Sequence, residues 1–153
     1  MSYEQKLAQL GFMLPPPPKP VATYIPAVLA GELLFLSGVI PLRDSKLVFE
    51  GKLGRELTVE QGYEAARVTL LNALAIIRHE LGTLDRVKKI VRMTGYVASV
   101  DGFVQHPAVI NGASDLLVKI FGEAGAHARV ALGAAGLPLN APIEIELIVQ
   151  VKL

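Results

Sequence analysis

Two segments near the C-terminus decide the fold: HARVALG at residues 127–133 and IEIELIVQV at Ile143–Val151. In each segment the side chains alternate in character with a period of two residues, which is typical of a β-strand. In the second segment one face holds only apolar side chains: Ile143, Ile145, Leu147, Val149 and Val151. The segment between them, residues 134–142, contains a glycine and two prolines and is expected to be a loop. We therefore expect two strands that each place one face on a hydrophobic core.

The other face of these strands carries the residues that are candidates for binding or catalysis. In residues 127–133 the two alternating sets are Ala128, Val130 and Leu132 on one side and His127, Arg129 and Ala131 on the other. If the first set faces the core, Arg129 shares a polar face with Glu144 and Glu146, on adjacent or near-adjacent strands. A guanidinium is a two-pronged donor for a carboxylate, and a nearby carboxylate can hold a water or move a proton. The same spacing is also typical of a solvated cross-strand ion pair, worth about 0.2–1 kcal/mol.

Length and hydropathy indicate one soluble domain with a subunit interface. The chain has 153 residues, of which 52% are hydrophobic, and its mean hydropathy is +0.45. Its apolar runs are far shorter than the roughly 20 residues that cross a bilayer, so no membrane association is expected. Apolar surface in excess of what a small domain can bury favours cover by another subunit.

Charge and residue usage exclude several classes of function. The net charge of +1 produces no strong field for nucleic acid. The absence of cysteine excludes disulfides, thiol nucleophiles and thiolate metal sites. Because the three histidines are isolated in sequence, we expect neither a metal site nor a cofactor. The first residues lack the apolar core of a signal peptide, so a cytoplasmic location is the expectation.

The N-terminal region is expected to be a helix followed by a stiff arm. Ser2 can cap a helix over residues 3–10, with Gln5 completing a capping box and Gly11 ending it. Residues 15–20 contain five prolines and predict an extended polyproline-II tether. We therefore divide the chain into an arm, residues 1–21, and a single domain, residues 22–153.

The remaining elements alternate in a way that predicts an α+β fold. Strands are expected at residues 22–28 and 32–40, turning at Ala30 and Gly31, with a short strand at 46–49. Thr58 and Gln61 form a second capping box, which begins a helix that ends at Gly82. A strand at 86–99 follows, and then a helix that begins near Pro107 and ends at Gly122 or Gly125. With the C-terminal pair, the order is β-β-α-β-α-β-β.

Other candidate residues stand alone in the sequence. No glycine-rich phosphate loop is present, and no Ser-His-Asp arrangement can be assembled. Ser37 and Gly38 follow an apolar strand, where they either let a ligand approach the backbone or simply end the strand. Asn111 lies on the second long helix and is an ordinary surface amide unless something covers it.

Several of these elements occur together in one known family. Tyr24, LSGVIP at residues 36–41, Asn111, Ala128-Arg129, Leu137-Pro138 and IEIE at residues 143–146 resemble the reactive-intermediate deaminase (Rid, or YjgF-like) superfamily, over residues from about 22 to 151. The arm and residues 103–112 resemble a branch labelled endoribonuclease L-PSP or chorismate-mutase-like. The resemblance implies a chorismate-mutase-like α+β fold with a β-sheet packed against two helices. It also implies a homotrimer whose sheets form a central barrel, with a pocket for a small carboxylate-bearing ligand at each subunit interface.

The resemblance also implies roles for individual residues. Arg129 matches the arginine that clamps a substrate carboxylate, and Glu144 matches the glutamate that holds the hydrolytic water. Pocket-lining positions are matched by Tyr24, Ser37, Gly38, Asn111 and Pro138. The implied reaction hydrolyses an enamine or imine acid, such as 2-aminoacrylate, to a 2-keto acid and ammonia. One departure is Ala131, where members with deaminase activity commonly have cysteine.

Three other functions remain open from the sequence. A trimeric protein that binds small carboxylic acids would keep Arg129 without turnover. A ribonuclease would need an acid–base pair, for which His127 near Glu144 is the candidate, and a basic path for phosphates. A chorismate mutase would want a second cation for its dianionic substrate. The sequence does not name the physiological substrate, because fold and family do not decide function.

Overall fold

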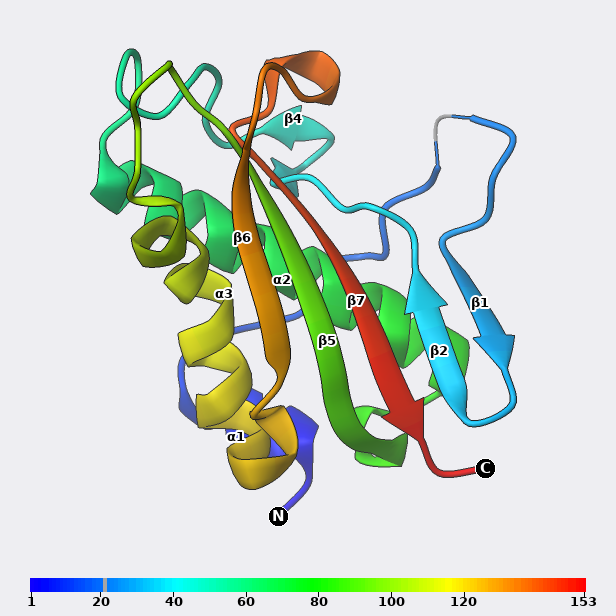
Figure 1. The fold of residues 1–153 in the computed structure, drawn as a ribbon. Coiled ribbons are helices and arrows are strands. Elements are labelled where there is room, and N and C mark those ends of the chain that lie inside the picture. The colour runs from blue at the N-terminus through cyan, green and yellow to red at the C-terminus, as the bar shows by residue number, and fades with distance from the viewer. Residues whose placement is uncertain (21) are drawn as a thin grey trace.

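The central element is a five-stranded mixed sheet with strand order β1-β2-β7-β5-β6. The computed structural model describes residues 1–20 and 22–153. The sheet strands are β1 (Ala27–Ala30), β2 (Leu33–Leu36), β5 (Val87–Ala98), β6 (Ala128–Ala134) and β7 (Ile143–Val151). A small second sheet pairs β3 (Leu42–Arg43) with β4 (Lys46–Leu47). The helices are α1 (Tyr3–Gln9), α2 (Val59–Leu81) and α3 (His106–Phe121), and Figure 1 shows α2 and α3 on one face of the sheet.

The helix ends follow the local sequence signals closely. Ser2 caps α1 and Thr58 caps α2, and in each case the glutamine three residues later returns a hydrogen bond to the cap residue. Helix α2 stops at Gly82, whose φ of 84° is the left-handed conformation that glycine adopts without strain. The predictions for α1 and α2 are confirmed to within a residue.

The first hairpin is shorter than expected. Strand β1 begins only after Pro26, because proline has no N–H to donate to the ladder. Strand β2 ends at Leu36, although Val39 makes an isolated bridge with Ile145. The predicted strands at residues 22–28 and 32–40 are therefore wrong in their extent. The expected boundary between arm and domain involves Val21, which lies outside the described residues.

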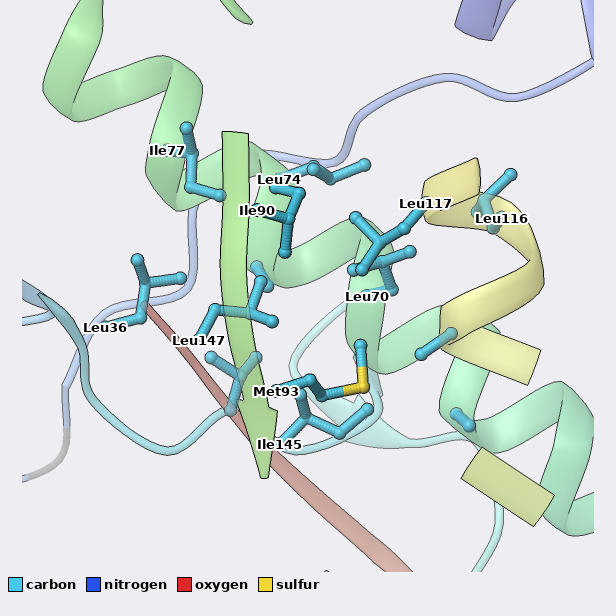
Figure 2. Packing of buried hydrophobic residues seen from close by; sticks show 14 of the residues in the cluster. Leu36, Leu70, Leu74, Ile77, Ile90, Met93, Leu116, Leu117, Ile145 and Leu147 are labelled. Atoms are coloured by element: carbon cyan, nitrogen blue, oxygen red, sulfur yellow. The ribbon is translucent and has the colours of Figure 1, made fainter. Parts of the chain in front are cut away.

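The core lies between the sheet and the two long helices. The five apolar side chains of β7 are all buried, as predicted. They pack with residues of α2, α3 and β5, and Figure 2 shows Leu147, Met93 and Ile90 beside Leu70, Leu74 and Leu117. In the described part of the chain, no helix has both the length and the apolar character needed to cross a bilayer.

Strand β6 presents the opposite face from the one that we expected. Arg129 is in register with Met93, which points into the core, whereas Glu144 is in register with Tyr96 on the open face. Because alternate residues of β5 point to opposite faces, Arg129 and Glu144 lie on opposite sides of the sheet. The prediction of one shared polar face is wrong. The alternation along β6 shows two faces, but α3 determines which of them points inward, because it supplies polar partners for Arg129.

Candidate functional site

A cavity of about 610 Å³ opens beside the end of β2. Its walls come from the proline-rich arm, the segment before β1, the loop after β2 and the turn Pro138–Asn140. Five of the seven residues that we singled out line it: Tyr24, Ser37, Gly38, Pro138 and Glu144. The structure thus brings together residues that are more than 100 positions apart in the sequence.

Glu144 lies directly against the backbone of Gly38. A Cβ atom added to Gly38 would stand 2.7 Å from Oε1 of Glu144 and 2.9 Å from its Cδ. Such distances are below van der Waals contact, so this position must be glycine if Glu144 is to keep its place. The requirement explains the glycine without any special backbone conformation.

The electrostatic surroundings of Glu144 favour its protonated form. Partial burial, and then the negative charge of Glu146, raise the pKa of the Glu144 carboxyl above its ordinary value. Its carboxylate accepts no hydrogen bond from any described residue, and it faces the cavity. A carboxylate with a raised pKa and a free oxygen is suited to hold a water and accept its proton.

The neighbouring carboxylate, that of Glu146, is hydrogen-bonded to another residue. The Tyr96 hydroxyl donates to Oε1 of Glu146 at 3.2 Å, and burial together with Glu146 raises the pKa of Tyr96. Glu146 is exposed and does not line the cavity. Of the two carboxylates on this face, Glu144 is therefore the one placed for chemistry in the cavity.

The hydrogen bonds of Ser37 lie within the wall of the cavity. Its hydroxyl donates to the carbonyl of Ile25 at 2.6 Å, and its backbone N–H donates to the carbonyl of Pro26 at 2.9 Å. These bonds hold the segment that carries Tyr24, whose side chain is half exposed at the cavity. On the opposite rim, Leu139 has φ 59°, a conformation uncommon for an apolar residue.

Arg129 and Asn111 lie away from this cavity. Nη1 of Arg129 donates to Oδ1 of Asn111 at 2.8 Å and to Oγ of Ser114 at 3.2 Å, on the α3 side of the sheet. Within residues 1–20 and 22–153, no carboxylate lies within 4 Å of the guanidinium. Its Nε and Nη2 donors are therefore free to bind an added carboxylate.

Ser114 and His127 belong to the Arg129 cluster, although we did not predict roles for them there. Nδ1 of His127 lies 2.6 Å from the carbonyl oxygen of Gly125, so Nδ1 carries the proton. Nε2 then accepts from the Ser114 hydroxyl at 2.9 Å, and the Ser114 oxygen accepts from Arg129. Two spacings signalled this cluster: Asn111 and Ser114 at i and i+3 of a helix, and His127 and Arg129 at i and i+2 beside a strand.

The described residues contain no group of three or more histidine, aspartate or glutamate side chains that could hold a metal ion. The polar residues that line the cavity include Glu144, Tyr24 and, from the arm, Lys19. Lys19 is a further lining residue that we did not predict.

Comparison with known proteins identifies the family of this chain. The family model described as "YjgF/chorismate_mutase-like, putative endoribonuclease" matches residues 4–151. The chain belongs to this family. Its relatives in the YjgF/chorismate-mutase-like family include protein TCP17 of Trypanosoma cruzi, 40% identical over 95% of this chain and 92% of the relative. A RutC family protein of Pyrococcus horikoshii is 30% identical over 86% of this chain and 89% of that protein.

Solved structures of the family share the whole fold. A structure described as a "putative endoribonuclease" from Shewanella oneidensis has a TM-score of 0.96 and 36% identity, covering 99% of this chain and 100% of the other. The expected α+β fold, a mixed sheet with helices on one face, is confirmed.

Proposed function

We propose that this protein hydrolyses reactive enamine or imine acids to 2-keto acids and ammonia, in a pocket completed by a neighbouring copy of the chain. The observation that carries the proposal is the position of Glu144. It is a half-buried carboxylate with a raised pKa, held against Gly38 and open to a cavity large enough for a ligand and a water. Family membership supports it, because the reactive-intermediate deaminases belong to the same superfamily.

The neighbouring copy is required by the position of Arg129. Strand β5 separates β6 from β7, so Arg129 and Glu144 are about 9–10 Å apart across the sheet, a further ~10 Å apart along it (the register positions Met93 and Tyr96), and on opposite faces. In the proposed assembly, a small ligand in the cavity of one chain meets the Arg129 of another chain. A head-to-tail contact closes into a ring when its rotation allows, and we propose a homotrimer with its sheets around a central barrel.

The open face of the sheet supports such an assembly. Val28 of β1 is about half exposed on this face, and Phe35 of β2 and Leu132 of β6 are also exposed there. Apolar side chains spread over a sheet face, next to edge strands β1 and β6, favour cover by another subunit.

The reaction needs positioning and proton transfer only. Arg129 of the neighbouring copy binds the substrate carboxylate through its free N–H groups, which fixes the imine carbon in the cavity. Ionised Glu144 accepts a proton from the water as its oxygen attacks that carbon. The resulting carbinolamine takes a proton on nitrogen, releases ammonia and leaves a 2-keto acid.

A binding protein without turnover is the second candidate, and Ala131 is the observation that favours it. Ala131 stands where catalytic members commonly have cysteine, while the cavity and Arg129 are retained. The ribonuclease alternative has no comparable support, because a net charge of +1 provides no basic path for phosphates.

An assay with enzymatically generated 2-aminoacrylate separates these candidates. A serine dehydratase produces the enamine, and the appearance of pyruvate is followed with and without this protein. We expect faster pyruvate formation in its presence. A rate equal to that in buffer, combined with calorimetric binding of 2-oxobutyrate, would leave the binding protein and exclude the enzyme.

A further inference from the structure

The proline-rich arm forms one wall of the cavity. Pro18, Lys19 and Pro20 line it, together with residues from the other end of the chain such as Glu144. Figure 1 shows the arm crossing the molecule from α1 to the segment before β1. The arm therefore contributes directly to the site.

The position of Lys19 is constrained although its side chain is exposed. Pro18 and Pro20 have a fixed φ, and a residue that precedes proline is confined to extended conformations. The start of the arm is anchored, because Leu7 is buried in the core and the backbone N–H of Tyr3 donates to Oδ1 of Asp85 at 2.8 Å. Further along, the ring of Phe12 lies under the guanidinium of Arg67.

Lys19 is the one cationic side chain among the residues that line the cavity, and Glu144 is the one acidic side chain. Within the described residues, no carboxylate lies within 4 Å of the Lys19 ammonium. Its charge is therefore available to a ligand. Arg129 of the neighbouring copy is already assigned to the substrate carboxylate. Lys19 is therefore left to bind a second group on the same ligand.

The size and lining of the cavity exceed what a three-carbon acid needs. A volume of about 610 Å³ falls in the range of sites that enclose much larger ligands, about 300–1,000 Å³. The rest of the lining is mainly apolar, with Ile40, Leu42 and Ile76 among its residues. Such walls suit a carbon chain between two polar ends.

We infer that the arm makes this site selective for 2-imino and 2-keto acids that carry a second anionic group on an apolar spacer, and that Lys19 binds that group. The inference rests on the proposed function and adds the substrate class to it. The reacting carbon lies at Glu144, so the second anion is kept at the arm, away from the negative charges of Glu144 and Glu146.

Calorimetry with two keto acids of equal length tests the inference. 2-Oxoadipate has a carboxylate at each end, whereas 2-oxohexanoate has one carboxylate and a methyl group. The wild-type protein is expected to bind 2-oxoadipate about five- to tenfold more tightly, as suits a partly solvated ion pair in a cleft. Lys19→Met should bring the ratio of the two Kd values close to one and leave the affinity for 2-oxohexanoate unchanged.

Two control variants make the result specific. Lys19→Arg should keep the preference, and Lys88→Met, at an exposed lysine outside the cavity, should not alter it. If Lys19→Met binds both acids and keeps the wild-type ratio, Lys19 does not select the ligand and the proposed function still stands. If the wild-type protein binds neither acid, the proposed function fails and this inference fails with it.

Discussion

Arg129 and Glu144 lie on opposite faces of the same sheet, with β5 between their strands. Each residue has a different partner: Arg129 bonds to Asn111 and Ser114 on α3, whereas Glu144 rests against Gly38 at the cavity. These are the two groups to which the proposed reaction assigns substrate binding and hydrolysis, and one chain does not bring them together. Because of this separation, the proposed reaction depends on the association of at least two chains.

The protein should be a trimer in solution. Light scattering at micromolar concentration should give a mass of about 49 kDa, three times the 16.4 kDa of the chain. The physical reason is the exposed apolar surface of the open sheet face. A mass equal to that of one chain would exclude a pocket shared between chains.

Gly38→Ala should damage activity without unfolding the protein. The added Cβ would stand 2.7 Å from Oε1 of Glu144 and displace the carboxylate. A displacement of about 1 Å at a reacting group can reduce turnover by about 100-fold. Gly136→Ala is the matched control, because its Cβ meets nothing within 4 Å. Equal loss in both variants, measured with the 2-aminoacrylate assay, would show that the Gly38 contact has no special role.

Glu144→Gln should lower imine hydrolysis by roughly 100-fold and change ligand affinity by less than about tenfold, because the amide keeps the shape but not the base. Glu146→Gln should have a much smaller effect, since Glu146 bonds to Tyr96 outside the cavity. The reverse order of sensitivity would mean that Glu146 handles the water.

The pH profile gives an independent check on Glu144. Because desolvation and then the charge of Glu146 raise its pKa, the ionised form that the proposed reaction uses appears at higher pH than for an ordinary carboxyl. The rate should therefore rise with pH through that raised pKa, and this step should be absent in Glu144→Gln. Stability changes in the opposite direction: because desolvation disfavours the ionised carboxylate in the folded state, the free energy of unfolding falls as pH rises from the ordinary carboxyl pKa through the raised one. The variant should thus gain thermal stability at neutral pH and not at acid pH.

Arg129→Lys should weaken binding of 2-oxobutyrate by about 1–3 kcal/mol, because lysine keeps the charge but loses the planar fork. Calorimetry measures the change, and Arg55→Lys at an exposed loop is the control. Affinity equal to wild type would show that Arg129 only holds Asn111 and Ser114.

Local signals in the sequence predicted the fold well. The capping boxes at Ser2 and Thr58 act within four residues, and β7 has five apolar residues on one side, so that its inward face was unambiguous. Which face of β6 points toward the core could not be predicted in this way. Its two alternating sets contain apolar residues on both sides, and the polar groups of Asn111 and Ser114, which bind Arg129 from α3, determined the outcome.

The site was predictable where a strand pattern or a family pattern marked it. Tyr24 and Pro138 were found through the family resemblance alone, whereas Ser37, Gly38 and Glu144 also stood out from the residues themselves. The structure places all five around one cavity. Lys19 has no such signal, because its contribution depends on where the arm passes after α1. Long-range placement of this kind is a property of tertiary packing and not of local spacing.

The most direct test of the central claim is complementation between two inactive variants. Arg129→Gln keeps Glu144, and Glu144→Gln keeps Arg129, so neither variant alone forms a complete site. If each site takes its two residues from different chains, trimers assembled from an equal mixture should regain about a quarter of wild-type activity, because random mixing completes that share of the sites. Co-refolding the differently tagged variants and measuring pyruvate formation from 2-aminoacrylate gives the answer. No recovery in isolated mixed trimers would contradict a site shared between chains.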